Sequence, residues 1–339
     1  MKNSIVKLIS LALALLMLIP FVFTGCAKEP DKSLEIKIYA LNGTTALGMA
    51  QMIDQVNKNQ SADPATVTDA MNYNISLFTA ADQITAAITT GECAIAALPT
   101  NVAAKLYQKT SGGIQLLAIN TLGVLYLLDN TGTVNSIEDL RGKTIYLPGS
   151  GSNPEFITAA LMKAYGLQVG SDVILDTTSY NSPDALQQAV ISGAAELAVL
   201  PEPKVSVITT QKPEVKVALN LTTEWDIKNG KNTMVQGCLV VNSAFAKEHP
   251  TEVSQFLADY QASVEYIKEG SDEAIEMIVN AGILPKAAIA KKALPKCNIC
   301  CLTGDEMKLV MDVFCQKLFE LNPASVGAIP DDGFYYKAK

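Results

Sequence analysis

Two segments of the chain repeat one structural pattern, and this repeat constrains the fold more than any other feature. The segment from Ala81 reads ADQITAAITTGECAIAALPTN, and the segment from Pro183 reads PDALQQAVISGAAELAVLPEP. Aligned without gaps, both contain a helical spacing of apolar residues, a glycine suited to a left-handed helix end, and a short apolar strand that a proline ends. The repeat predicts two similar α/β lobes that enclose a cleft.

The repeat extends upstream in both halves of the chain. Each half begins with an apolar strand, a loop rich in small residues and a helix, and each has a further strand candidate before the repeated unit; these elements are residues 36–41, 42–45, 46–57 and 71–77, and residues 143–147, 148–153, 154–165 and 173–177. Each lobe therefore reads β-α-β-α-β, which is typical of a mostly parallel sheet with helices on its faces.

The chain passes between the lobes twice. Two apolar strands that almost adjoin, residues 114–120 and 124–129, suit the passage from the first lobe to the second, and residues 234–242 suit the return. Beyond the return the pattern is helical, over 243–269, 271–281, 286–293 and 304–320. We therefore expect a discontinuous first lobe of residues 34–122 and 234–339, and a second lobe of residues 123–233.

The start of the chain predicts export. Lys2 and Lys7 flank the start of an almost wholly apolar run, residues 8–23, which is short for a membrane span. The run leads into FTGC, which resembles a bacterial lipobox, although Phe23 stands where leucine is usual. We expect a signal peptide over residues 1–25, lipidation of Cys26, and a polar tether over residues 26–33 that holds the protein on the outer face of the cell membrane. The alternative is an ordinary cleaved signal with an incidental cysteine.

The charge of the chain limits its partners. The formal net charge is −8, and removal of Lys2 and Lys7 with the signal brings it to −10. An acidic surface argues against nucleic acid as a partner, because nucleic-acid binding needs a basic footprint. Arg141 is the only arginine, and it precedes a strand rather than a cleft loop. A strongly anionic ligand would therefore depend on lysine, backbone N–H groups or helix N-termini.

The six cysteines other than Cys26 leave three interpretations open. They are Cys93, Cys238, Cys297, Cys300, Cys301 and Cys315, and the cluster KCNICC holds three of them. A zinc site would need four ligands, and no histidine lies near the cluster in the sequence to supply one of them. A structural disulfide is compatible with export, and free buried thiols that pack as small apolar side chains are the third interpretation.

The candidate ligand site follows from the strand directions. In open parallel α/β sheets, ligands bind outside the carboxyl ends of the strands. This rule selects six loops, which are residues 42–45, 78–79, 99–101, 149–153, 179–181 and 201–203. The candidate ligand residues in these loops are Asn42, Gly43, Thr44, Thr45, Thr100, Asn101, Ser150, Gly151, Ser152, Tyr180 and Glu202.

Small polar residues in such loops also have a purely structural interpretation. Serine, threonine and asparagine favour helix N-caps for stability alone, so any single residue among them could cap a helix without contacting a ligand. The sequence GSGSNP lacks the lysine of a phosphate loop. Tyr39 and Tyr146 lie within strands and are expected in the core, whereas Tyr180 is the better candidate for stacking on a ligand.

Catalysis finds little support in the sequence. His249 is the only histidine, and it lies in AKEHP, away from the six loops. Glu202 lies in a candidate loop, but acid–base catalysis needs a second group near the same bond, and no partner for it stands out. We predict no catalytic residues, no cofactor and no metal.

Together, the lipobox, the paired lobes and the helical tail resemble the substrate-binding lipoproteins of ABC importers. Within that class the chain is similar to proteins that bind nitrate, sulfonates, taurine or thiamine-precursor pyrimidines. The residues that carry the resemblance are SIEDLRGKTIYLPGSGSNPE at 136–155, NSAFAKEHPTEVSQFL at 242–257, and the helix–Gly–strand–Pro units that end at Pro99 and Pro201.

The resemblance implies a periplasmic-binding-protein-like fold with a two-strand hinge, and a function in solute capture. Ligand contacts carried over by position fall at 42–45, 100–101, 150–152 and around Glu202. The near absence of arginine departs from what a sulfonate or nitrate binder might show and favours a neutral or heteroaromatic ligand. The implied partners are a membrane permease and its ATPase, and the protein is expected to be a monomer.

Two other functions remain open from the sequence alone. Similar lobes occur in enzymes of the menaquinone pathway and of pyrimidine synthesis, although the export signal counts against this class. A surface sensor or adhesin would need a further partner module that the sequence lacks.

Overall fold

The computed structural model describes residues 29–62 and 70–338. The contacts between residues divide the chain into a unit of residues 1–30 and a unit of residues 31–339. The fold described below is that of the second unit. The predicted signal peptide and the predicted lipidation site at Cys26 lie outside the described residues. Within the part that is described, no helix combines the length and hydrophobicity of a membrane span.

The first lobe is built on a six-stranded sheet of order β11-β4-β10-β3-β1-β2. Its strands are β1 (Ile36–Leu41), β2 (Tyr73–Phe78), β3 (Ile95–Pro99), β4 (Ile114–Thr121), β10 (Gly237–Asn242) and β11 (Ile299–Leu302). Strand β1 pairs in parallel with β2 and β3, as the β-α-β pattern predicts. Strand β10 runs antiparallel to β3 and β4, because it enters this sheet on its way back from the second lobe.

The second lobe is built on a five-stranded sheet of order β7-β6-β8-β5-β9. Its strands are β5 (Leu125–Asp129), β6 (Thr144–Tyr146), β7 (Ile174–Asp176), β8 (Leu197–Pro201) and β9 (Lys216–Asn220). The crossover strand is again the antiparallel one, since β5 runs opposite to β8 and β9. Both sheets are therefore mixed, and the expectation of mostly parallel sheets holds only for the strands of the repeat.

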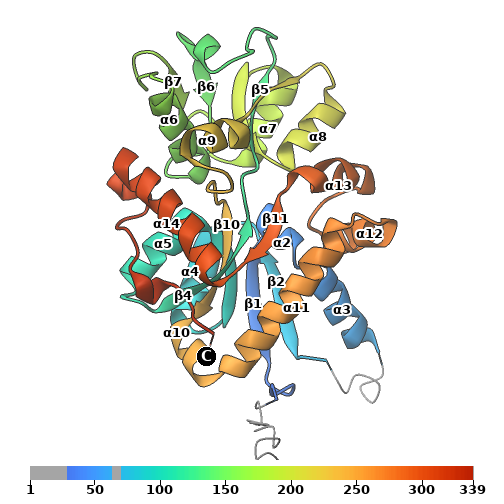
Figure 1. Cartoon of the computed structure of the whole chain (residues 1–339). Coiled ribbons are helices and arrows are strands. Elements are labelled where there is room, and N and C mark those ends of the chain that lie inside the picture. Colours follow the sequence, from blue (N-terminus) through green and yellow to red (C-terminus); the bar gives the residue numbers. More distant parts are fainter. Residues whose placement is uncertain (1–28, 63–69, 339) are drawn as a thin grey trace, which may run out of the picture. The chain divides into compact units, whose positions relative to one another are not determined.

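The helices pack on the faces of these sheets, as Figure 1 shows. Their bounds are α2 (Thr44–Leu47), α3 (Ala50–Ser61), α4 (Ala81–Thr90), α5 (Thr100–Lys109), α6 (Asn153–Ala164), α7 (Pro183–Ser192), α8 (Lys204–Gln211), α9 (Leu221–Asn229), α10 (Ser243–Glu248), α11 (Pro250–Lys268), α12 (Asp272–Asn280), α13 (Ala287–Ala293) and α14 (Gly304–Leu321). Short 3₁₀ turns, η2 to η5, are Glu138–Leu140, Leu294–Lys296, Pro323–Ser325 and Asp332–Phe334.

The internal repeat is confirmed in three dimensions. Helices α4 and α7 end at Gly91 and Gly193, which adopt the left-handed conformation with φ of 78° and 84°. A residue with a Cβ is strained at such a position, so a glycine ends each helix. Strands β3 and β8 follow and end at the paired prolines Pro99 and Pro201.

One predicted helix is divided in the structure. The sequence pattern predicts a single helix over 243–269, but α10 ends before His249 and α11 begins at Pro250. Proline has no N–H to continue the hydrogen bonding of α10, and its fixed φ suits the first turn of a new helix. His249 has φ of −127° and ψ of 52° at the junction, outside the helical region.

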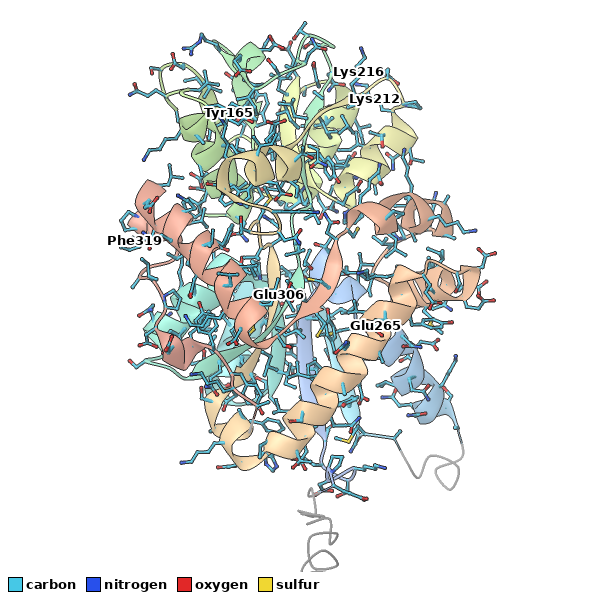
Figure 2. All side chains as sticks on the ribbon, viewed as in Figure 1. Tyr165, Lys212, Lys216, Glu265, Glu306 and Phe319 are labelled. Carbon is cyan, nitrogen blue, oxygen red and sulfur yellow. The ribbon has the colours of Figure 1, made fainter. Side chains whose placement is uncertain are left out.

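The C-terminal tail contacts both lobes. Strand β11 pairs with β4 in the first sheet, whereas α13 packs against α8 and α14 packs against α6. Figure 1 shows α13 and α14 on opposite sides of the region between the two sheets. Figure 2 labels Glu306 near the start of α14 and Phe319 near its end.

Helix α14 joins the cores of the two lobes. One continuous cluster of buried side chains contains Leu98 of β3, Val199 of β8 and Phe314 of α14. The Phe314 ring is fully buried, and its centroid lies 5.8 Å from that of Trp225 on α9. The lobes are therefore held by shared apolar packing as well as by the crossing strands.

Truncation of Phe314 tests this shared core. Phe314→Ala is expected to lower the free energy of unfolding by about 3–5 kcal/mol, because it removes buried apolar surface and leaves a cavity. Leu309→Ala is the matched control on the same helix, since Leu309 is 65% exposed, and its expected effect is within about 0.5 kcal/mol. Urea unfolding measures both, and equal effects of the two variants would contradict a shared core at Phe314.

Candidate functional site

Loops that follow strands of both sheets enclose a cavity of about 420 Å³, which we call the inner chamber. Its walls come from the loops after β1, β3, β6 and β8 and from the crossing segments. The lining residues are Leu41, Asn42, Gly43, Thr44, Thr45, Pro99, Asn101, Val102, Val124, Pro148, Ser150, Gly151, Ser152, Asn153, Pro154, Pro183, Pro201, Glu202, Pro203, Lys204 and Gln236.

Most of the predicted ligand residues line this chamber. The structure brings together Asn42, Gly43, Thr44, Thr45, Asn101, Ser150, Gly151, Ser152 and Glu202. Thr79, from another of the six loops, lies in an adjoining cavity instead.

Two predicted ligand residues, Thr100 and Tyr180, do not line the chamber. Thr100 is fully buried, and its Oγ1 donates a hydrogen bond of 2.8 Å to the Val235 carbonyl. The Tyr180 ring packs edge-on against Tyr146, with 5.3 Å between the ring centroids. Thr100 supports the wall of the site from behind, and Tyr180 packs against its own lobe.

Hydrogen bonds hold the first-lobe side of the chamber in place. The buried Asn120 of β4 donates through Nδ2 to the Thr45 carbonyl at 3.0 Å, and Thr45 Oγ1 donates to the Leu41 carbonyl at 2.6 Å. Gly237 of β10 lies directly against this loop. A Cβ at Gly237 would lie 2.5 Å from both Asn120 Oδ1 and Thr45 Cγ2, so only glycine fits there.

Asparagine side chains bridge the two lobes at the chamber wall. Asn101 Nδ2 donates to the Gly151 carbonyl at 3.2 Å, from the start of α5 to the loop before α6. Asn153 Nδ2 donates to Thr100 Oγ1 and to the Gln236 carbonyl, each at 3.2 Å. These bonds link the N-termini of α5 and α6 directly.

The orientation of the Asn153 amide is fixed by its partners. Thr100 Oγ1 donates its proton to the Val235 carbonyl, so in its bond with Asn153 it is the acceptor. The Gln236 carbonyl can only accept. Both acceptors need a donor, so both bond to the amide nitrogen, and neither can bond to Asn153 Oδ1. It is buried without a hydrogen-bond partner, and the same holds for Gln236 Nε2. The chamber wall thus holds one unpartnered acceptor and one unpartnered donor.

Gln236 and Lys204 are site residues that the sequence analysis missed. Gln236 lies in the returning segment MVQGC, where it is one polar residue within an apolar run. That isolated polar position was the available signal. Lys204 begins α8 and directly follows the predicted loop of residues 201–203.

Glu202 is a buried carboxylate at the base of α8. Only 1% of the residue is exposed, and it accepts hydrogen bonds of 3.0 Å from the backbone N–H and the Oγ of Ser206. Lys296 Nζ lies 3.9 Å from Glu202 Oε1. Burial raises the pKa of Glu202, although the bonds from Ser206 and the charge of Lys296 oppose the shift. Glu202 therefore satisfies a backbone N–H of the first turn of α8.

The charges at the chamber cancel. Glu202 and Lys204 are the charged residues in its described lining, and Lys204 forms an ion pair with Asp184. Arg141 is outside the lining and pairs with Asp172 on the surface of the second lobe. The chamber therefore offers an anion no unpaired arginine.

Neither His249 nor the described cysteines lie at the chamber. His249 is half-buried at the α10–α11 junction, and its Nδ1 lies 4.0 Å from Glu252 Oε2. The described cysteines are all free thiols, and burial raises the pKa of Cys301 to about 11 and of Cys315 to about 12. Over residues 29–62 and 70–338, no group of three His, Cys, Asp or Glu side chains is placed to hold a metal ion.

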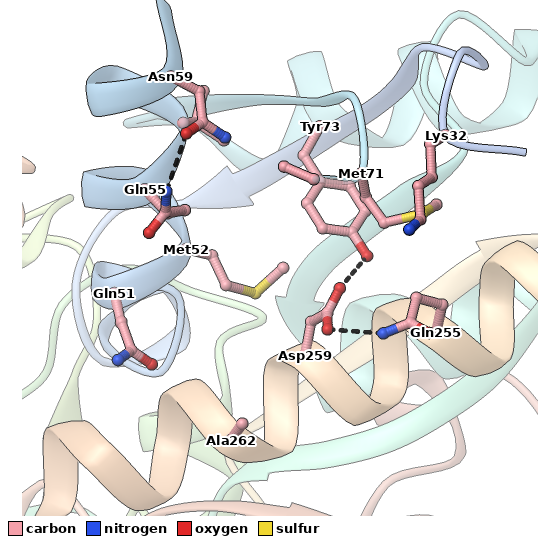
Figure 3. A pocket seen from close by; sticks show the side chains of 12 residues that line it. Lys32, Gln51, Met52, Gln55, Asn59, Met71, Tyr73, Gln255, Asp259 and Ala262 are labelled. Carbon is pink, nitrogen blue, oxygen red and sulfur yellow. Dashed lines mark hydrogen bonds between the residues drawn. The ribbon is translucent and has the colours of Figure 1, made fainter. Parts of the chain in front are cut away.

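A separate cavity of about 460 Å³ lies on the first lobe between α3, β2 and α11, and Figure 3 shows it from close by. Three of its polar side chains bond to one another. Tyr73 donates to Asp259 at 2.6 Å, and Gln255 donates to the other oxygen of the same carboxylate at 2.8 Å. The inner chamber differs in having unpartnered polar atoms, and it is therefore the candidate site.

A pH series tests the environment of Glu202. Because the folded protein holds the Glu202 proton more tightly than the unfolded chain does, ionisation of this group makes unfolding easier as the pH rises. The free energy of unfolding of the native chain minus that of Glu202→Gln is therefore expected to be larger at pH 4 than at pH 7. Urea unfolding at both pH values measures it, with Glu196→Gln at an exposed position as the control. A difference that does not change with pH would contradict the assignment.

The chain was compared with protein-family models and with curated protein sequences. The model of the family described as NMT1/THI5 like matches residues 112–274. A search of curated protein sequences found no match.

Several solved structures share the fold. An ABC transporter protein from Parabacteroides distasonis is 22% identical, covers 91% of this chain and 100% of its own length, and superposes with a TM-score of 0.74. The periplasmic aliphatic sulphonate binding protein SsuA from Escherichia coli is 13% identical, with coverage of 90% and 92% and a TM-score of 0.70. The ligand binding component of an ABC-type import system from Staphylococcus aureus, solved with zinc bound, is 14% identical, with coverage of 89% and 96% and a TM-score of 0.68.

These matches confirm the fold class and the resemblance that the sequence predicts. The chain has the two-lobe α/β fold of periplasmic binding proteins, and its central part matches the NMT1/THI5-like family model.

Proposed function

We propose that the protein is the extracytoplasmic solute-binding component of an ABC importer. The observation that carries the proposal is a chamber between two lobes whose wall holds the unpartnered Asn153 Oδ1 and Gln236 Nε2. Buried polar atoms are nearly always hydrogen-bonded, so such a pair favours a bound molecule whose entry shifts these side chains toward the chamber and supplies the partners. The fold shared with ABC import components supports the same function.

The chemistry of the chamber favours a neutral or heteroaromatic solute. The described lining carries one positive and one negative side chain, and both already have partners. An unpartnered donor and an unpartnered acceptor on the wall residues suit a ligand that carries both kinds of group, as amides and many nitrogen heterocycles do. We propose that the contacts come from the loops of residues 42–45, 150–153 and 201–204, with Asn101 and Gln236.

The transport mechanism follows from the two lobes. A solute that touches both lobes stabilises the arrangement in which they are close, by its difference in affinity for the two arrangements. We propose lobes of residues 34–122 with 234–339 and of residues 123–233, which move about the crossing segments near Thr121 and Gln236. The closed form is the one delivered to the permease, while lipid on Cys26 keeps the protein close to it.

The enzyme alternative would need reacting groups at the chamber. Glu202 is occupied by Ser206 and Lys296, and His249 lies elsewhere on the first lobe. This arrangement favours binding over turnover, and the experiment below separates them.

Native mass spectrometry of the full chain purified from its own cells tests the function. The native chain is expected to carry one small molecule, and Ser152→Trp is expected to lose it, because the indole fills the inner chamber. Ser171→Trp, at an exposed position outside the lining, is the control and is expected to keep the molecule. If Ser152→Trp keeps the small molecule, the proposed site is wrong. If fresh protein converts the released molecule, the protein is an enzyme instead.

The intact mass of the mature chain tests the anchor. We expect a chain that begins at Cys26 and carries acyl groups, and that partitions into the detergent phase of a cloud-point extraction. An ordinary signal peptide would give an unmodified chain that stays in the aqueous phase, which would contradict lipid anchoring.

A further inference from the structure

A second cavity, of about 740 Å³, adjoins the inner chamber, and we call it the outer chamber. It lies between the α7 and α8 side of the second lobe and the segment that leads into α13. The two chambers share a neck, lined by Leu41, Asn42, Gly43, Pro183, Pro203 and Lys204. The two chambers therefore adjoin at these residues, which favours a molecule that occupies both.

One wall of the outer chamber is apolar. Ile283, Leu284 and Ile289 from the α13 side face Val207 of α8, and each of the four is less than one-tenth exposed. Ala288 of α13 also lines the chamber, and its own side chain is exposed. Apolar surface of this kind gains free energy when an apolar group covers it.

The same chamber contains a buried polar atom without a partner. Gln187 of α7 lines it and is 7% exposed, and its Oε1 accepts no hydrogen bond from the described residues. The charged groups of its lining are Asp184, Lys204 and Lys286. Asp184 and Lys204 form their ion pair at the neck, and Lys286 is exposed.

Resting on the proposed function, we propose that the ligand is an elongated neutral molecule in two parts. An amide-like edge occupies the inner chamber against Asn153 and Gln236, and an apolar body passes the neck into the outer chamber. The continuity of the two cavities, the apolar wall and the paired charges at the neck together select this class. A compact ligand that ends within the inner chamber would leave the exposed Pro285 and Ala288 of the outer chamber uncovered.

Two primary amides serve as probes of this arrangement. Acetamide offers the amide edge alone, whereas hexanamide adds four methylenes, and the variants below test whether these methylenes lie in the outer chamber. A fully buried methylene strengthens binding about fourfold, so hexanamide is expected to bind the native chain at least about tenfold more tightly than acetamide. Ligand-observed NMR titration measures the weak affinities of both.

Adjacent positions on α13 provide a matched pair of variants. Ala288→Trp places an indole in the outer chamber, and it is expected to bring hexanamide affinity down to that of acetamide without changing acetamide binding. Ala287→Trp, at an exposed neighbour outside both linings, is expected to change neither.

The outcomes separate this inference from the proposed function. If hexanamide binds no more tightly than acetamide, or if Ala288→Trp leaves its affinity unchanged, the outer chamber is not a ligand subsite. If neither amide binds the native chain, the amide-like edge is the wrong ligand class. The proposed function itself fails if Ser152→Trp, which blocks the inner chamber, keeps the molecule that co-purifies with the native chain, or if fresh protein converts that molecule.

Discussion

The structure depends on apolar packing that runs without interruption from one lobe to the other. Helix α14 contributes Phe314 and Leu318 to a cluster that also holds buried residues of both sheets. Because this packing holds the lobes on one side, the loops at the strand ends meet at defined positions on the other. The hydrogen bonds between Asn101 and Gly151, and between Asn153 and Thr100, act within that frame.

The frame explains why the chamber has unpartnered polar atoms. A loop free to move would turn Asn153 Oδ1 and Gln236 Nε2 toward partners or water. Here the Asn153 nitrogen is held by two acceptors, so its oxygen keeps one direction. Gly237, next to Gln236, lies too close to Asn120 and Thr45 for any side chain.

Much of the fold could be predicted from the sequence because it is encoded locally. Helix α4 and its copy α7 each end at a glycine, and β3 and β8 each end at a proline at the matching position of the repeat. The division of residues 243–269 at Pro250 was missed because the apolar spacing continues across it. The placement of α14 against both lobes was also missed, since it is set by tertiary packing rather than by local sequence.

The candidate site was predictable in part for the same reason. Small polar residues mark the loops at strand ends in the sequence. Nine of the eleven ligand residues predicted from these loops line the chamber. Thr100 and Tyr180 illustrate the limit, because sequence position names a loop but does not say which side of it faces the ligand. Gln236 contributes through a crossing segment, and the strand-end rule does not include such segments.

The most direct test of the account is a crystal structure of the protein with the molecule it carries from its own cells. The account predicts density for one small molecule in the inner chamber, with hydrogen bonds to Asn153 Oδ1 and Gln236 Nε2. A molecule bound instead in the cavity beside Tyr73 and Asp259, with only water between the lobes, would contradict it.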